Sequence, residues 1–157
     1  MIHQFQLPNL AATNNLAHAT AKAIVPNFVI TLNGNLGAGK TTLVREILRA
    51  LGVTGSIKSP TFTLVEPYKV NDINVFHFDL YRFSDPEEWF DAGFDEYFSQ
   101  PQISFIEWAE KAQGLIPQVD WQINIEVDDE CRQLSILTNT IIGEECLTNL
   151  INSDAIY

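Results

Sequence analysis

A glycine-rich segment between an apolar segment and an amphipathic one constrains this chain more than any other feature. Within VITLNGNLGAGKTTLVREIL, residues 29 to 48, Gly34, Gly39, Lys40 and Thr41 match the pattern G-x-x-x-x-G-K-[ST]. The residues FVITL before the glycines are typical of a buried strand, and TTLVREILRAL after them is typical of a helix. A strand, loop and helix in this order present backbone N–H groups to phosphate. The segment therefore predicts an α/β domain that binds a nucleotide.

Each residue type in the loop suits the binding of a polyphosphate. Glycines allow the positive φ angles that turn successive amides inward. The ammonium group of Lys40 can reach the β- and γ-phosphates, and the Thr41 hydroxyl can be a ligand of Mg²⁺. We expect the whole loop to contact the nucleotide, namely Gly34, Asn35, Leu36, Gly37, Ala38, Gly39, Lys40, Thr41 and Thr42.

Two carboxylates follow apolar strands, as a magnesium–nucleotide site requires. Asp79 follows VFHF, and Glu107 follows ISFI. In an open α/β sheet such residues meet at the carboxyl ends of neighbouring strands. One carboxylate could complete the metal shell and the other could orient or deprotonate water, while the alternative for each is a helix cap or a surface charge. His77 lies two residues before Asp79 on the same face of the strand and could support the site from behind its ligands, but a hydrogen-bonded core histidine is the preferred interpretation. Trp108 either closes over the site or fills the core.

The segment KSPTF, residues 58 to 62, follows the helix after the phosphate loop. Nucleotide enzymes often have a mobile segment at this position. Thr61 could offer its hydroxyl or amide to the γ-phosphate or the metal, and the alternative is a plain turn begun by Pro60.

The rest of the chain predicts a single domain, residues 1–157, with a P-loop NTPase-like three-layer fold. Its central sheet should be mixed and partly parallel, with an antiparallel extension. We expect strands at 3–7, 28–33, after residue 60, 73–81 and 103–108, and a hairpin from 120–127 and 132–139. Helices are expected at 12–24, from the loop to about residue 51, in the acidic segment 85–96, and at 143–151.

Composition narrows the classes of function. The formal charge is −11, from 20 acidic and 9 basic residues, which opposes direct nucleic-acid binding over a broad face. Two distant cysteines, Cys131 and Cys146, indicate neither a zinc site nor a disulfide framework. There is no apolar run near 18 residues and no pattern of an export signal. We therefore expect a cytoplasmic protein with no membrane contact.

Four motifs together resemble one family. GNLGAGKTT, SPTFTLVEPY, HFDLYR and EW occur in the order and spacing of TsaE, also called YjeE, the bacterial ATPase of tRNA threonylcarbamoyladenosine synthesis. The resemblance runs from the N-terminal helix to about residue 110. The family usually has an aspartate where Asn35 stands, but a polar residue there should not disturb the backbone of the loop.

The resemblance implies a small ATPase that binds ATP or ADP with Mg²⁺. It implies TsaD and TsaB as partners, contact with tRNA only through their complex, and a monomer when isolated. Thr41 and Glu107 would be metal ligands, and Asp79 would act on water beside the catalytic Lys40. Trp108 and the SPTF segment would belong to a nucleotide-responsive surface.

The residues that cover the adenine are harder to predict. If residues 3–7 form a strand beside 28–33, the segment LPNLAAT would place Leu10 against the ring and Thr13 near its edge. The alternative is that Leu10 only packs against the start of the helix.

Three other functions share some of these motifs. A small-molecule kinase usually clamps phosphate with several arginines, whereas this chain has four, of which only Arg82 lies near a candidate strand end. A GTPase would need a guanine-reading N-K-x-D sequence, which is absent. A nucleotide-sensing adaptor without significant hydrolysis overlaps with the family resemblance.

Overall fold

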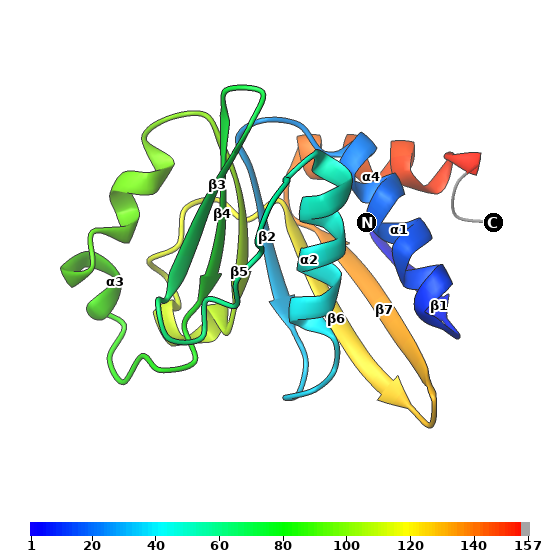
Figure 1. Cartoon of the computed structure of the whole chain (residues 1–157), viewed down its shortest axis with the longest axis horizontal. Helices are drawn as coiled ribbons and strands as arrows, with labels where there is room; N and C mark the ends of the chain where they lie inside the picture. Colours follow the sequence, from blue (N-terminus) through cyan, green and yellow to red (C-terminus); the bar gives the residue numbers. More distant parts are fainter. Residues whose placement is uncertain (155–157) are drawn as a thin grey trace.

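A seven-stranded sheet in the order β1-β7-β6-β2-β5-β4-β3 forms the centre of the computed structural model, which describes residues 1–154 (Figure 1). β6, β2, β5 and β4 are parallel, while β3, β7 and β1 each run antiparallel to the strand beside them. The mixed α/β architecture with an antiparallel extension is therefore confirmed. The strands are β1 (Ile2–Leu7), β2 (Phe28–Asn33), β3 (Val65–Val70), β4 (Ile73–Asp79), β5 (Gln102–Glu107), β6 (Trp121–Asp128) and β7 (Cys131–Thr138).

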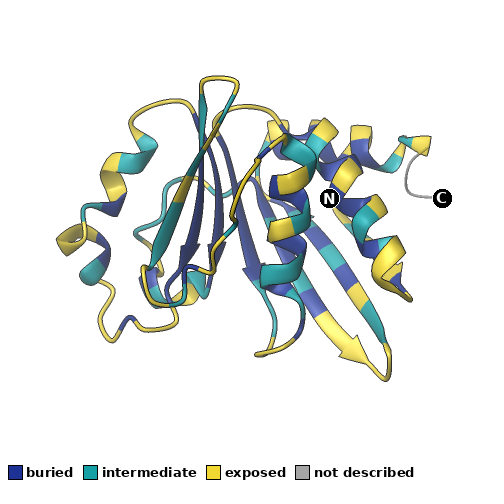
Figure 2. Ribbon diagram, viewed as in Figure 1, coloured by how far each residue is buried: buried dark blue, intermediate teal, exposed yellow. Residues whose placement is uncertain are grey.

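One face of the sheet is covered by the three longest helices. These are α1 (Leu10–Ala23), α2 (Lys40–Leu51) and α4 (Ile141–Ile151), and their apolar residues form one buried cluster with those of the strands. β2 is buried on both faces because it lies at the middle of the sheet, as Figure 2 shows. Its five buried residues fix the position of the phosphate loop that follows.

Short helices cover only part of the opposite face. α3 (Glu88–Asp91) and the 3-10 helices η1 (Phe94–Phe98) and η2 (Ala109–Ala112) pack over β2, β5 and β4. Phe78 of β4 is surrounded there by aromatic rings, with centroids 5.2 Å away for Phe94 and 5.7 Å away for Trp89. The acidic segment thus forms helices as predicted, but they are short and held by aromatic packing.

The position of β1 differs from the sequence-based expectation. Residues 3–7 form a strand, but β1 pairs with β7, and β7 and β6 separate it from β2. The expectation that 3–7 lies beside 28–33 is therefore wrong. β1 cannot pair with β2 because β2 already pairs with β5 along one edge and with β6 along the other.

Local hydrogen bonds explain where several elements begin or end. α1 begins two residues earlier than predicted because Asn9 Oδ1 accepts a hydrogen bond from Ala12 N at 2.9 Å. Thr140 caps α4 in the same way. Residues 61–64 form a turn rather than the start of β3, since Leu64 N donates to Pro60 O at 2.8 Å. No helix within residues 1–154 has the length and apolar composition needed to cross a membrane.

Candidate nucleotide site

The phosphate loop between β2 and α2 packs closely against the β6–β7 hairpin. Gly34 has a φ of 154°, and a Cβ at this position would lie 2.7 Å from the carbonyl oxygen of Ile125 in β6. Gly39 has a φ of 106°, and a Cβ there would lie 3.0 Å from Arg132 Nε. From the sequence, glycines in the loop were explained by the orientation of the amides and by close approach of the backbone to a phosphate. The structure adds that they let the loop approach a neighbouring strand.

Lys40 is folded back onto its own loop. Its ammonium group donates to the Gly34 carbonyl oxygen at 2.7 Å and lies 3.9 Å from the centroid of the Trp108 ring. Burial lowers the pKa of Lys40, while the carboxylates of Glu107 and Asp79 act in the opposite direction. Trp108 itself has a φ of 59°, an uncommon conformation for a residue with a large side chain. The backbone after β5 is thus shaped to place an indole over the lysine.

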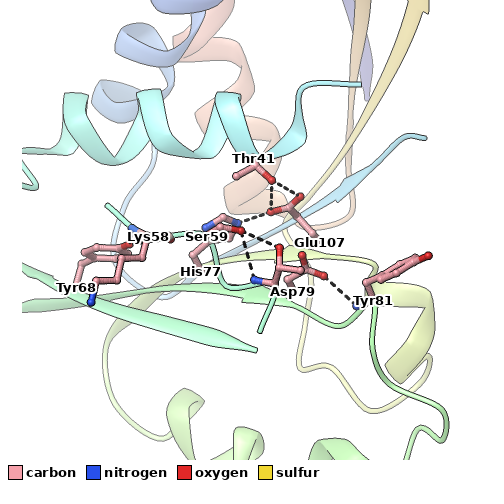
Figure 3. A network of polar contacts seen from close by, with 9 residues as sticks. Thr41, Lys58, Ser59, Tyr68, His77, Asp79, Tyr81 and Glu107 are labelled. Carbon is pink, nitrogen blue, oxygen red and sulfur yellow. Dashed lines mark hydrogen bonds and ion pairs between the residues drawn. The ribbon is translucent and has the colours of Figure 1, made fainter. Parts of the chain in front are cut away.

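Two predicted metal ligands from distant parts of the sequence meet at the start of α2. The Thr41 hydroxyl lies 3.0 Å and 3.2 Å from the two carboxylate oxygens of Glu107, to which it can donate (Figure 3). Glu107 is the last residue of β5 and is buried. Residues 1–154 contain no cluster of three histidine, cysteine or acidic side chains arranged for a metal. One carboxylate and one hydroxyl fit Mg²⁺, which usually keeps waters and binds substrate phosphates.

His77 contacts the same carboxylate. The residue lies on β4 and is buried, and its Nε2 is 2.5 Å from Glu107 Oε2, so the ring N–H can donate to the carboxylate. The sequence favoured a hydrogen-bonded core histidine, and the side chain is indeed buried and paired. Its partner, however, is the candidate metal ligand. Sequence spacing could not reveal this because the two residues lie on different strands.

Asp79 lies beside Glu107 at the carboxyl end of the next strand. The two residues are paired in the register of β4 and β5, and Figure 3 shows both side chains near Thr41 and His77. Asp79 Oδ1 accepts a hydrogen bond from Tyr81 N at 2.9 Å. Burial raises the pKa of the Asp79 carboxyl; the Tyr81 hydrogen bond opposes this rise, and the charge of Glu107 adds to it. This carboxyl therefore holds its proton to a higher pH than an exposed aspartate.

Thr61 lies in the turn that leads into β3. Its hydroxyl and that of Ser59 form a hydrogen bond of 2.8 Å. The same turn is connected to the site because Asp79 N donates to Leu64 O at 2.9 Å. A change in this turn can therefore reach the backbone of Asp79. Contact of Thr61 with a phosphate or a metal stays a prediction.

The residues predicted to cover the adenine lie at the start of α1. Leu10 is 62% exposed, and the Thr13 hydroxyl donates to Asn9 O at 3.5 Å. The start of α1 lies at the same end of the sheet as the phosphate loop (Figure 1). Leu10 therefore has an apolar surface that is free to contact a ring. Its contact with adenine stays a prediction.

Arg132 is a site residue that the sequence did not reveal. It lies near the start of β7, and its Nε donates to the carbonyl oxygen of Ala38 at 2.7 Å. A single arginine after an acidic turn belongs to no recognisable sequence motif. Arg132 reaches the phosphate loop only because the β6–β7 hairpin packs against that loop. A groove of about 790 Å³ lies beside this contact, lined by residues 33 to 38 of the loop region and 124 to 127 of β6.

Comparisons with known proteins show which family the chain resembles. Residues 7–134 match the family model described as threonylcarbamoyl adenosine biosynthesis protein TsaE. The tRNA threonylcarbamoyladenosine biosynthesis protein TsaE of Haemophilus influenzae is 44% identical over 85% of this chain and 82% of its own length. The protein of that name from Bacillus subtilis is 40% identical over 86% and 83%.

A solved structure has the same fold. The crystal structure of Bacillus subtilis YdiB superposes with a TM-score of 0.80 and 29% identity, over 96% of this chain and 95% of that one. The match covers the β6–β7 hairpin and α4 as well as the motifs around the loop. Since the family model spans most of the sequence and relatives match at about 40% identity, the chain belongs to the TsaE family.

Proposed function

We propose that this chain is a Mg²⁺-dependent ATPase of tRNA threonylcarbamoyladenosine biosynthesis. The observation that supports it most is the contact between Thr41 and Glu107, which joins two motifs 66 residues apart. A threonine hydroxyl from the loop and a buried carboxylate from the neighbouring parallel strand are the protein ligands of Mg²⁺ that P-loop enzymes use. The bound ion would supply charge stabilisation at the β- and γ-phosphates. The names of the relatives support the biosynthetic role.

The loop would bind the phosphates through its backbone amides and Lys40. Lys40 would have to leave the Gly34 carbonyl oxygen, to which it now donates, before it could reach a phosphate. Arg132 would hold the loop in shape from the hairpin side through its bond to Ala38. Leu10, which is exposed at the start of α1, would contact the adenine, whereas the buried Thr13 would only support that start. Both ATP and ADP should fit the same loop.

Asp79 is the best candidate for the residue that acts on water. It is buried beside Glu107 without a direct hydrogen bond to Thr41, and burial raises its pKa. A carboxylate with a raised pKa accepts a proton more readily than an exposed one. His77 would act through Glu107 by orienting the carboxylate, as the groups around metal ligands do.

The partners of the chain would be the TsaD and TsaB proteins, with tRNA reached through their complex. The net charge of −11 supports an indirect role toward tRNA, since few basic residues are available to neutralise phosphates. We further propose that the chain is a cytoplasmic monomer when isolated.

A second candidate is a nucleotide-sensing adaptor with little hydrolysis of its own. The position of Lys40 favours it, because the ammonium group is bonded to the loop and covered by Trp108. Hydrolysis could then depend on a partner that moves Trp108. In that case nucleotide binding, rather than turnover, would be the property that the isolated chain displays.

Phosphate release tests these alternatives. The purified chain is incubated with Mg²⁺ and either ATP or GTP, alone and with TsaD and TsaB. The ATPase proposal expects phosphate from ATP, more of it with the partners, and much less from GTP. Tight ATP binding with no release under any condition would favour the adaptor, and no nucleotide binding at all would contradict both.

A further inference from the structure

A second surface lies beside the nucleotide site, on the outer side of the turn before β3. A groove of about 360 Å³ is lined by Phe62, Leu64, Arg82, Phe83, Glu88 and Asp91, together with Ala92. Phe62 is 81% exposed, although phenylalanine usually contributes to a core. The guanidinium of Arg82 lies 5.3 Å from the centroid of the Phe62 ring. An exposed aromatic ring at a formed groove is typical of a binding surface.

Acidic residues outnumber basic ones around the groove, because Glu88 and Asp91 line it together with a single basic residue, Arg82. Residues 85 to 96 contain six carboxylates and no basic residue. The only ion pair found within residues 1–154 joins His77 to Glu107, so none of these six carboxylates forms an ion pair with another described residue. Glu88 is nevertheless fixed in position, because its carboxylate accepts hydrogen bonds from the backbone and hydroxyl of Ser84. The surface thus combines an apolar centre with a mainly acidic rim, in which hydrogen bonds from Ser84 hold Glu88.

We infer that this surface, formed by Phe62, Leu64, Phe83, Glu88 and Asp91, docks a protein segment that presents an apolar side chain next to lysine or arginine. The inference rests on the proposed function, in which the chain works with TsaD and TsaB. An apolar side chain would pack against Phe62 and Phe83, and the basic side chain would pair with Glu88 and Asp91. An acidic rim also speeds the approach of a basic partner.

The position of this docking surface gives it access to the hydrolytic residues. Phe62 belongs to the turn that Leu64 N closes by donating to Pro60 O, and the carbonyl oxygen of Leu64 accepts from Asp79 N. This second hydrogen bond joins the turn directly to the backbone of Asp79. A partner seated on Phe62 can therefore shift or fix Asp79, which links docking to hydrolysis.

Ile141 provides a matched control. It is also 81% exposed, but it begins α4 at the opposite end of the sheet, beside Asn27 and Gln102 at the starts of β2 and β5. The experiment measures the affinity of the TsaD–TsaB pair for the full chain with ATP and Mg²⁺ present. The variants are Phe62→Ser, Phe62→Leu, the double variant Glu88→Gln with Asp91→Asn, and Ile141→Ser. Thermal unfolding and ATP affinity are measured for each.

Phe62→Ser should weaken binding of the pair at least about 30-fold, as expected for a central contact, and Phe62→Leu should restore most of it. The double variant should weaken binding and reduce its salt dependence while ATP affinity stays unchanged. Ile141→Ser should bind as the unsubstituted chain does. The docking inference would be overturned if Ile141→Ser weakened binding of the TsaD–TsaB pair and Phe62→Ser did not. It would also be overturned if the unsubstituted chain did not bind the pair. Docking without ATP binding by the unsubstituted chain would instead overturn the ATPase proposal.

Discussion

The phosphate loop lies between two unlike sides of the sheet. On the side of β5 and β4, polar side chains contact one another: the buried Glu107 is joined by hydrogen bonds to the buried His77 and to the partly buried Thr41. On the side of β6 and β7, Arg132 holds the loop carbonyl of Ala38 beside an open groove. In the proposed function, the first side would therefore carry the chemistry, whereas the second would shape the loop and leave room for a ligand.

The largest effect is expected on the side of β5 and β4, for Asp79→Asn. The amide keeps an oxygen for the Tyr81 N–H but cannot take a proton from water, so turnover should fall at least about 100-fold with little loss of ATP affinity. Turnover of the unsubstituted chain should also fall as pH drops through the raised pKa of Asp79, because the base must be deprotonated. Phosphate release over a pH series measures both, with Asp72→Asn at the distant β3–β4 turn as control. Full turnover of Asp79→Asn would assign the chemistry to another residue.

Lys40→Ala tests the loop that both sides share. Loss of a charged donor to the β- and γ-phosphates should lower ATP affinity by about 30- to 100-fold, which corresponds to about 2–3 kcal/mol. Calorimetry with ATP and Mg²⁺ measures the loss. Lys69→Ala on β3 removes the same charge from an exposed position and should change nothing. An affinity for ATP that survives in Lys40→Ala would contradict the phosphate-loop interpretation.

The side of β6 and β7 should show a smaller effect. Arg132→Ala removes one hydrogen bond to Ala38, worth about 1 kcal/mol, and should weaken ATP binding about 5-fold without changing the Mg²⁺ dependence. Arg49→Ala is the control, because Arg49 also donates to a backbone carbonyl but lies near the far end of α2. A loss of Mg²⁺ dependence in Arg132→Ala would remove the distinction between the two sides.

The smallest effect is expected at the start of α1. Leu10→Ala should weaken ATP binding a few-fold and leave inorganic triphosphate binding unchanged if the side chain covers the adenine. A point substitution is preferable to a deletion of residues 1–12, because β1 pairs with β7 along its whole length. Competition binding with both ligands measures the ratio. Equal changes for the two ligands would mean that Leu10 only supports the fold.

Features determined by neighbouring residues could be predicted from the sequence, whereas features determined by the pairing of distant elements could not. The limits of β2 were predicted to the residue, because its apolar run is bounded by Pro26 with Asn27 and by Gly34. The meeting of Asp79 and Glu107 was predicted because the carboxyl ends of parallel strands lie at one edge of the sheet. That Glu107 rather than Asp79 would share the metal site with Thr41 was implied only by the family resemblance. The place of β1 in the sheet could not be predicted, since strand pairing is decided by which edges remain free after the other strands have paired.

Side-chain contacts between distant elements were the main features of the site that the sequence analysis did not predict. Arg132 reaches the loop only because the β6–β7 hairpin packs against Gly39, and no spacing in the sequence encodes that approach. The partner of His77 was missed for the same reason, since β4 and β5 are joined by a long connection. Both omissions are side chains that act on a predicted site residue from another element.

The dependence of ATP affinity on Mg²⁺ in Glu107→Gln tests the central claim most directly. Glu107 is the protein carboxylate in contact with Thr41, so Mg²⁺ should tighten ATP binding to the unsubstituted chain and to the exposed control Glu110→Gln. Calorimetric titration with and without Mg²⁺ should show that Glu107→Gln still binds ATP in the absence of the ion but gains little from its addition. An undiminished gain from Mg²⁺ in Glu107→Gln would contradict the account.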